Sequence, residues 1–224
     1  MNDPLMIVIF IGVLYFGGII HEIGHGLAAL RCGDDTAKLM GRITLNPIAH
    51  FDPIMSFIVP IIMLIVVKIP FGGMKPVPVN PYNFDNFNDW KAFRRADIFV
   101  SIAGPAAQIL FATVVLVIFL LLSPFITPNS YAFYLFFYGF LINIFIAFFN
   151  LIPIPPLDGS HVFKYLLATE NRVVYEKLGR QFGFMFLIAF VVLGGVNILN
   201  PIFNVFLRLF IWTYSHISLS AILS

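Results

Sequence analysis

The sequence predicts an all-α protein that crosses a membrane several times. Of its 224 residues, 60% are hydrophobic and only 11% are charged, and the mean hydropathy is +0.95. A water-soluble protein of this length needs far more polar surface, whereas apolar runs of about 20 residues suit the hydrocarbon core of a bilayer. Several such runs occur, and the 27 phenylalanines suit a surface that faces lipid. We therefore expect an all-α polytopic membrane protein with about five to six transmembrane helices.

The apolar runs place these helices in order along the chain. We expect the first helix from about Leu5 to Leu30, retained in the protein because it lacks the basic start of a cleavable signal peptide. Four further helices are expected at about residues 98–122, 131–152, 182–199 and 202–217. No segment between them has the composition of a separate soluble domain.

The apolar segment from Ile54 to Val67 does not fit this series. It is short for a span and contains Pro60, and the following stretch, Pro70–Pro81, is too rich in proline and glycine to continue as a helix. A full crossing here would also place the next basic connection on the wrong side of the membrane. We therefore expect a re-entrant or extended segment at about residues 54–81, which enters from the cytoplasm and returns to it.

Basic residues assign the sides of the other helices, because cytoplasmic loops are enriched in lysine and arginine. Basic residues follow the first helix, precede the helix at 98–122 and follow the helix at 131–152. The connections Ser123–Ser130 and Asn200-Pro201 carry no charge. This pattern predicts a multi-pass protein of the cell membrane in contact with the lipid bilayer. The net charge of +2 gives no reason to expect nucleic acid as a partner.

The first expected helix contains the sequence His21-Glu22-Ile23-Gly24-His25. Residues four apart lie on one helix face, so both imidazoles can reach the same metal ion. Glu22 is rotated by roughly 100° from His21 and can contact a water at the metal without being a ligand. The alternative is that these side chains line a polar contact between helices. Each ionisable residue in an apolar helix costs roughly 2.5 kcal/mol or more, which favours the metal site.

Catalytic zinc takes three protein ligands, so one further ligand must come from elsewhere in the chain. Asp158 is the strongest candidate because it follows the proline-rich stretch Asn150–Leu157 that ends the preceding helix. Its spacing leaves two roles open, a metal ligand or the N-cap of the next helix. His25 lies about 9 Å of helix from Arg31, and Asp158 lies at a similar distance from Lys164. The two residues thus share a depth near the cytoplasmic side, which favours the ligand.

These motifs resemble those of the site-2 proteases, a family of intramembrane zinc metalloproteases. His-Glu-Ile-Gly-His at 21–25 and Leu-Asp-Gly at 157–159 match the two signatures of that family. Ala103-Gly104-Pro105 resembles its small-residue packing motif, and Gly72-Gly73 resembles its re-entrant glycine segment. The likeness reaches from the first helix to about Phe163 and is to the compact prokaryotic branch, which lacks PDZ and CBS domains.

The resemblance implies a zinc metalloendopeptidase with one Zn²⁺ ion. It implies that His21, His25 and Asp158 are the metal ligands and that Glu22 is the catalytic glutamate. Residues 1–224 would form a single transmembrane protease domain, with a metal-binding core at about 5–163 and accessory helices at about 182–217. The substrates would be single-span membrane proteins or membrane-anchored peptides, cut within their transmembrane segments near the cytoplasmic face.

Two further features could contact the substrate. Asn150 precedes Asp158 by about two helical turns and could donate a hydrogen bond to the developing oxyanion. The alternative is an amide bonded to a neighbouring helix. The extended stretch Phe71–Val79, which includes Gly72 and Gly73, could pair with an unwound substrate strand. The alternative is a linker that lies against the helices.

Two other functions compete with proteolysis. A divalent-metal transporter would also carry ionisable residues within its helices, but it should show ligands on several helices along a route. A catalytically inactive module that binds membrane segments would not need Glu22. The sequence favours the protease over both.

Overall fold

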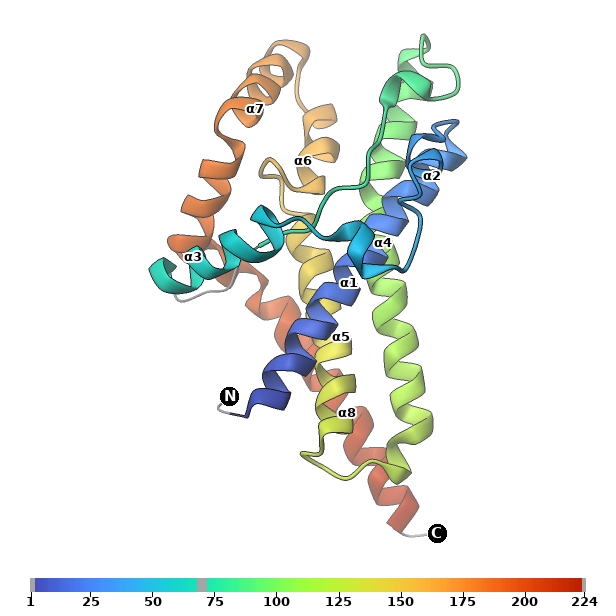
Figure 1. The fold of residues 1–224 in the computed structure, drawn as a ribbon, viewed down its shortest axis with the longest axis vertical. Helices are drawn as coiled ribbons and strands as arrows, with labels where there is room; N and C mark the ends of the chain where they lie inside the picture. Colours follow the sequence, from blue (N-terminus) through green and yellow to red (C-terminus); the bar gives the residue numbers. More distant parts are fainter. Residues whose placement is uncertain (1–2, 68–71, 223–224) are drawn as a thin grey trace.

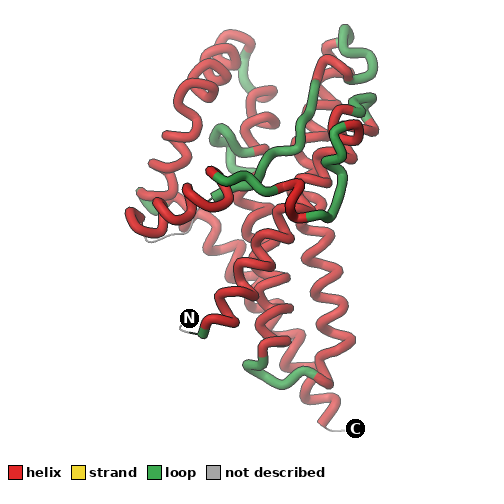
Figure 2. Tube along the Cα trace, viewed as in Figure 1, coloured by secondary structure: helices red, strands yellow, loops and turns green. Residues whose placement is uncertain are grey.

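The computed structural model describes residues 3–67 and 72–222, which form a bundle of long helices (Figure 1). Within these residues no strand is present (Figure 2). The helices are α1 (Pro4–Arg31), α2 (Thr36–Leu39), α3 (Val59–Val67), α4 (Trp90–Leu122), α5 (Tyr131–Asn150), α6 (Asp158–Phe163), α7 (Thr169–Val192) and α8 (Asn200–Ile222). Short 3-10 turns lie at Pro47–His50, Pro81–Asn83, Ser123–Phe125, Lys164–Leu166 and Gly195–Leu199, and a π-helical turn lies at Ile54–Ile58.

Side-chain caps mark where α1 and α4 begin. Asp3 accepts a hydrogen bond from the Leu5 N–H at 2.9 Å at the start of α1. Asp89 accepts from the Lys91 N–H at 2.8 Å, so α4 begins at Trp90 rather than near residue 98. The first turns of α4 are polar and extend beyond its apolar stretch, and for this reason the hydropathy pattern does not detect them.

Four helical stretches in the described part of the chain are long and apolar enough to cross a membrane: Pro4–Arg31, Trp90–Phe125, Tyr131–Asn150 and Gly195–Ser215. This confirms the all-α polytopic membrane fold. The predicted count of five to six spans is not confirmed. The predicted helix at 182–199 is divided in the structure, because the chain turns at Gly194 with φ of 78°. Its first part belongs to α7, which already begins at Thr169 and whose first half is charged.

The centre of the bundle consists of α1, α4 and α5, which pack against one another. Phenylalanines from α4, α5 and α8 pack together in one cluster, in which the rings of Phe119 and Phe210 stack with their centroids 4.6 Å apart. The outer faces are apolar as well, with Leu110 exposed by 66% and Leu121 by 72%. Such faces suit lipid, since hydrocarbon tails are as apolar as leucine.

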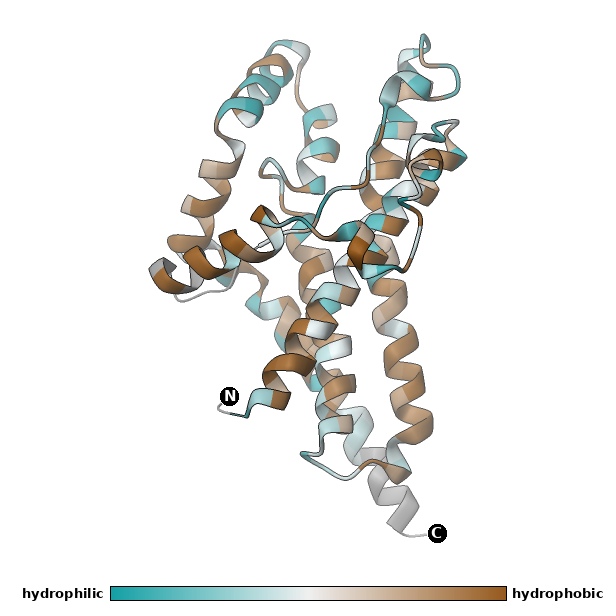
Figure 3. Cartoon of the chain, in the orientation of Figure 1, coloured by the Kyte–Doolittle hydropathy of each residue, from teal (hydrophilic) through white to brown (hydrophobic). Residues whose placement is uncertain are grey.

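The described parts of the segment at 54–81 lie against each other, whereas its return to the cytoplasmic side stays a prediction. In Figure 1, α3 lies across the direction of α4 and α5. The returning limb is bonded to the entering limb: the Gly73 N–H donates to Met55 O at 2.9 Å, and the Lys75 N–H donates to His50 O at 3.0 Å. Pro70 and Phe71 lie outside the described residues. Hydrophilic residues gather at the end of the molecule where α4 begins and α6 meets α7 (Figure 3).

Candidate metal centre

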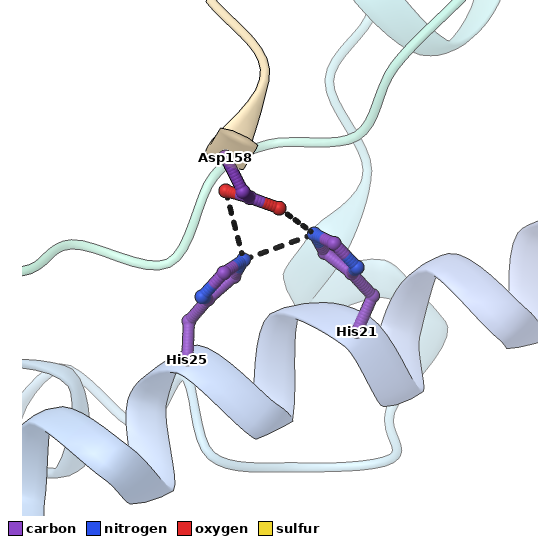
Figure 4. A group of neighbouring side chains, drawn as sticks. All are labelled: His21, His25 and Asp158. Carbon is purple, nitrogen blue, oxygen red and sulfur yellow. Dashed lines mark hydrogen bonds and ion pairs between the residues drawn. The ribbon is translucent and has the colours of Figure 1, made fainter. Parts of the chain in front are cut away.

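Three side chains predicted from the sequence meet at one point in the bundle (Figure 4). The Nε2 atoms of His21 and His25 are 2.9 Å apart. Asp158 places Oδ2 at 3.1 Å from His21 Nε2 and Oδ1 at 3.3 Å from His25 Nε2. One potential ligand atom from each side chain lies within 4.8 Å of the others. Asp158 thus forms a single cluster with two histidines, although it lies 133 residues after His25 in the sequence.

Helix α1 presents both imidazoles on one face, one turn apart. Helix α4 passes close behind them because it carries a glycine there. A Cβ atom at Gly104 would overlap His25 Nε2 and would lie 2.8 Å from His21 Cε1. Gly24 of α1 is equally restricted, since its Cβ would lie 2.6 Å from Ala103 O. The small residues of both helices therefore create the space that the imidazoles fill.

Asp158 is the first residue of α6, and its carboxylate points away from the helix that it begins. Leu157, not Asp158, occupies the N-cap position, and no side chain caps this helix. Gly159 packs so tightly against the end of α5 that a Cβ there would overlap Leu151 O. The capping role that the spacing left open for Asp158 therefore does not describe this structure, and its side chain is directed toward the histidines.

A polar contact joins α4 to the residues that follow α6, the helix that begins at Asp158. The carboxylate of Asp97, which is buried on α4, lies 2.7 Å from Lys164 Nζ and accepts a hydrogen bond from the Tyr165 hydroxyl at 2.7 Å. Lys164 and Tyr165 directly follow α6. Since α4 also packs against α1, this contact connects α6 through α4 to the helix that carries both histidines.

The other ring nitrogens of the histidines identify their tautomers. His25 Nδ1 lies 2.7 Å from Val100 O, which can only accept, so His25 donates at Nδ1. His21 Nδ1 lies 3.1 Å from Gln108 Oε1. The amide of Gln108 is oriented by its Nε2, which donates to Gly17 O at 3.4 Å, so Oε1 faces His21 as an acceptor. In the neutral form, both imidazoles would therefore carry their proton on Nδ1 and a lone pair on Nε2.

This arrangement fits a bound cation. Two Nε2 atoms and a carboxylate face one another at about 3 Å, and the neutral tautomers with the proton on Nδ1 would leave no proton donor between them. In the described part of the chain, Asp158 Oδ2 is buried and has no hydrogen-bond partner. Such a cluster repels itself unless positive charge lies at its centre. Two imidazoles and a carboxylate are a known ligand set for catalytic zinc, which keeps its fourth position for water.

Glu22 lies beside this cluster rather than in it. Its Oε2 atom accepts a hydrogen bond of 2.6 Å from the backbone N–H of Val77 in the extended stretch after α3. The cluster of potential ligands in the described residues contains His21, His25 and Asp158 and does not include Glu22. The expectation that Glu22 contacts a water at the metal stays a prediction.

The other predicted site residues are not joined to the three side chains by any hydrogen bond in the described part. Asn150 Nδ2 donates to Ile146 O of its own helix at 3.1 Å, and not to a neighbouring helix. Gly73 uses its N–H toward Met55 and its carbonyl toward the Ser56 hydroxyl at 3.0 Å. Gly72 packs against Pro60. Both glycines therefore belong to the doubled-back segment, and Gly73 has its backbone groups already bonded.

Gln108 contacts His21 and Val77 contacts Glu22 in the structure, and no sequence motif singled out either residue. Gln108 could have been noticed, because it is an amide within an apolar stretch and lies one helical turn after Gly104. Val77 acts through its backbone, and no side-chain pattern signals a backbone contact.

The curated proteins that resemble this chain are named as zinc metalloproteases. A family model described as Peptidase family M50 matches residues 125–194, which include Asp158. "Putative zinc metalloprotease YwhC" of Bacillus subtilis is 33% identical over 191 residues, which are 83% of this chain and 81% of that protein. "Putative zinc metalloprotease Rip2" of Mycolicibacterium smegmatis is 30% identical over 181 residues, 80% of this chain and 64% of that protein. No solved structure matches the chain significantly.

A more distant relative is archaeal. "Putative zinc metalloprotease MJ0611" of Methanocaldococcus jannaschii is 26% identical over 139 residues, 62% of this chain and 69% of that protein. The similarity to the Bacillus protein spans about four fifths of both chains, which is enough to decide the family. The chain belongs to peptidase family M50, the family of the site-2 proteases.

Proposed function

We propose that the protein is an intramembrane zinc metalloprotease that hydrolyses peptide bonds within transmembrane segments of membrane-anchored substrates. The observation that carries this proposal is the convergence of two imidazole Nε2 atoms and a carboxylate on one point, with a glutamate next to the first histidine in the sequence. Both histidines and the glutamate lie in a helix that is apolar and long enough to span a membrane. The relatives named as zinc metalloproteases support it.

In this proposal His21, His25 and Asp158 hold one zinc ion. Zinc with three protein ligands supplies Lewis acidity and lowers the pKa of a water in its fourth position. Glu22 takes a proton from the attacking water and later donates it to the nitrogen of the departing peptide. Gln108 and Val100 hold the imidazole rings in the tautomer that leaves Nε2 free.

The site is proposed to lie near the cytoplasmic face of the cell membrane. His25 lies about 9 Å along the helix from Arg31, and Asp158 lies a similar distance from Lys164. Basic connections favour the cytoplasmic side. A substrate segment should therefore be cut toward its cytoplasmic end, and water should reach the site from that side.

The proposed substrates are single-span membrane proteins or membrane-anchored peptides. A helical segment hides its carbonyl groups in internal hydrogen bonds, so it must unwind before it can be cut. Residues of low helix propensity near the bond should help, since glycine costs about 1 kcal/mol relative to alanine. We further propose one protease domain over residues 1–224, with its metal-binding core at about 5–163 and accessory helices at about 182–217.

Metal analysis combined with a cleavage assay tests this function. The parental protein and Glu22→Gln are purified in detergent, their zinc content is measured, and each is incubated with a single-span substrate. Both should contain about one zinc ion, because Glu22 is not a ligand. Only the parental protein should cleave, and the loss should be about 100-fold or more. Mass spectrometry of the products should place the cut within the transmembrane segment.

Reconstitution of the same proteins into lipid vesicles distinguishes the competing functions. Zinc uptake into these vesicles without any cleavage of substrate would support a transporter and contradict the protease. Binding of the substrate by the zinc-loaded parental protein without cleavage would support an inactive binding module. Cleavage by Glu22→Gln near the parental rate would contradict the role given to Glu22.

A further inference from the structure

The extended stretch after α3 makes a direct backbone contact with the glutamate of the site. The Val77 N–H donates to Glu22 Oε2 at 2.6 Å, across 55 residues of sequence. Among the described residues, this is the one hydrogen bond recorded for the Glu22 carboxylate. A hydrogen bond to an ionised acceptor is about twice as strong as a neutral one, so it holds the carboxylate firmly.

The donor in this contact is itself held in place. Val77 stands between Pro76 and Pro78, whose rings restrict the backbone on both sides. Its side chain is buried and packs against α1, where a Cβ at Gly26 would lie 3.2 Å from Val77 Cγ1. Neither flanking proline has an N–H, so Val77 supplies the only backbone donor between residues 76 and 78.

Both ends of the stretch are anchored as well. The Lys75 N–H donates to His50 O at 3.0 Å, and Arg42 Nη2 donates to Lys75 O at 2.7 Å. At the other end, the Asn80 N–H donates to the buried carboxylate of Asp34 at 2.7 Å. The donor that faces Glu22 thus belongs to an extended stretch that is bonded on either side of it.

We propose that the backbone N–H of Val77 is a positioning group that sets the orientation of Glu22 for catalysis. A hydrogen bond to Oε2 fixes the plane of the carboxylate and leaves Oε1 to exchange a proton with water. Glutamate has several rotatable bonds, so without this bond the side chain would spread over several orientations. The doubled-back segment would then act on the reaction through one amide. This inference rests on the proposed function of Glu22 as the proton carrier.

Removing the N–H without removing the segment tests the inference. Val77→Pro deletes the donor, and proline suits the site because Val77 precedes Pro78 and is already restricted to extended conformations. Val79→Pro is the matched control: it also follows a proline, and no hydrogen bond from the Val79 N–H is recorded in the described residues. In a second variant, the α-hydroxy acid analogue of valine is incorporated at position 77, which replaces the N–H by an oxygen and keeps the side chain.

We expect the zinc-loaded Val77→Pro and ester variants to show kcat about 100-fold lower, since a misplacement near 1 Å can have that effect. Their KM and zinc content should match those of the parental protein, and Val79→Pro should match it throughout. A purely structural contact would lower the yield or the Tm but leave kcat per zinc-loaded molecule unchanged, and this result would overturn the inference. If Val77→Pro does not fold, the ester variant decides.

The parental protein separates this inference from the function on which it rests. If the parental protein cleaves and the ester variant cleaves equally well, the positioning role is wrong and the protease stands. If the zinc-loaded parental protein does not cleave at all, the proposed function is wrong, and the positioning role is overturned with it.

Discussion

The Nδ1 atom of His21 lies 3.1 Å from Oε1 of Gln108, so a buried amide on α4 sets the tautomer of a histidine on α1. The bond matters because only the Nδ1-protonated tautomer directs a lone pair toward the centre of the cluster. The carbonyl of Val100 plays the same part for His25. Two acceptors on α4 thus orient both histidines of α1, with Nε2 of each ring toward the centre of the cluster.

Replacing Gln108 by leucine should weaken zinc binding. Gln108→Leu keeps the approximate volume but removes the acceptor, so the His21 ring can turn or change tautomer. Loss of such a partner typically lowers metal affinity by about 10–100-fold. Gln108→Glu keeps the acceptor and should stay near the parental affinity. Competition with a chromogenic chelator measures both, and equal affinities for the leucine variant and the parental protein would contradict the role of Gln108.

Removing any one of the three clustered side chains should weaken zinc binding further. We expect His21→Ala, His25→Ala and Asp158→Ala each to lower the zinc affinity by a larger factor than the loss of an outer partner, which costs about 10–100-fold. The reason is that each would remove a proposed direct ligand. Glu170→Ala, at an exposed acidic residue of α7, serves as the control. Stoichiometric zinc at unchanged affinity in Asp158→Ala would remove that residue from the ligand set.

Cysteine labelling should show that residues 54–81 return to the side from which they enter. In a Cys32→Ser background, Asp35→Cys and Asn88→Cys flank this segment and should both react from the cytoplasm. Thr127→Cys, in the uncharged connection after α4, should react from the opposite side. All three positions are exposed. Thr127 is preferred to Asn129, whose φ of 59° does not suit cysteine. Opposite labelling of Asp35→Cys and Asn88→Cys would mean that the segment crosses the membrane.

The buried carboxylate of Asp34 should make stability depend on pH. Burial raises its pKa, but hydrogen bonds from Thr36, Asn80 and Asn83 outweigh this and hold the pKa below its ordinary value of 3.8. A group whose pKa is lower in the folded state stabilises the fold above its unfolded pKa, and this contribution is lost as the pH falls through the folded value. Asp34 joins the end of α1 to the stretch that carries Val77.

Asp34→Asn should therefore lower the free energy of unfolding by about 1–3 kcal/mol at pH 7, as expected for lost hydrogen bonds to a charged group. The difference from the parental protein should shrink as the pH falls below 3.8. Thermal unfolding in detergent at several pH values measures it, with the exposed neighbour Asp35→Asn as the control. A deficit that stays constant down to the lowest pH would contradict this assignment.

Composition and spacing were sufficient for much of this protein. The apolar runs predicted α1 and α5 nearly to their ends, because a membrane span needs a long apolar stretch that is visible without knowledge of its neighbours. The four-residue spacing placed His21 and His25 on one face, because helical periodicity is local. The predicted bounds 182–199 were wrong, because α7 begins in a charged stretch at Thr169 and ends at Val192, before the turn at Gly194. Hydropathy alone does not show that a charged helix continues into an apolar stretch.

The sequence by itself determined the membrane fold, the pair of histidines and the residues that could join them. Only the tertiary structure decided that Asp158 meets both imidazoles, that Gln108 and Val100 set their tautomers, and that Val77 holds Glu22. The physical reason is that periodicity and hydropathy act over a few residues. The contacts of the site join α1 to α4, α6 and the extended stretch after α3. Their partners are backbone groups or single polar atoms that leave no periodic pattern in the sequence.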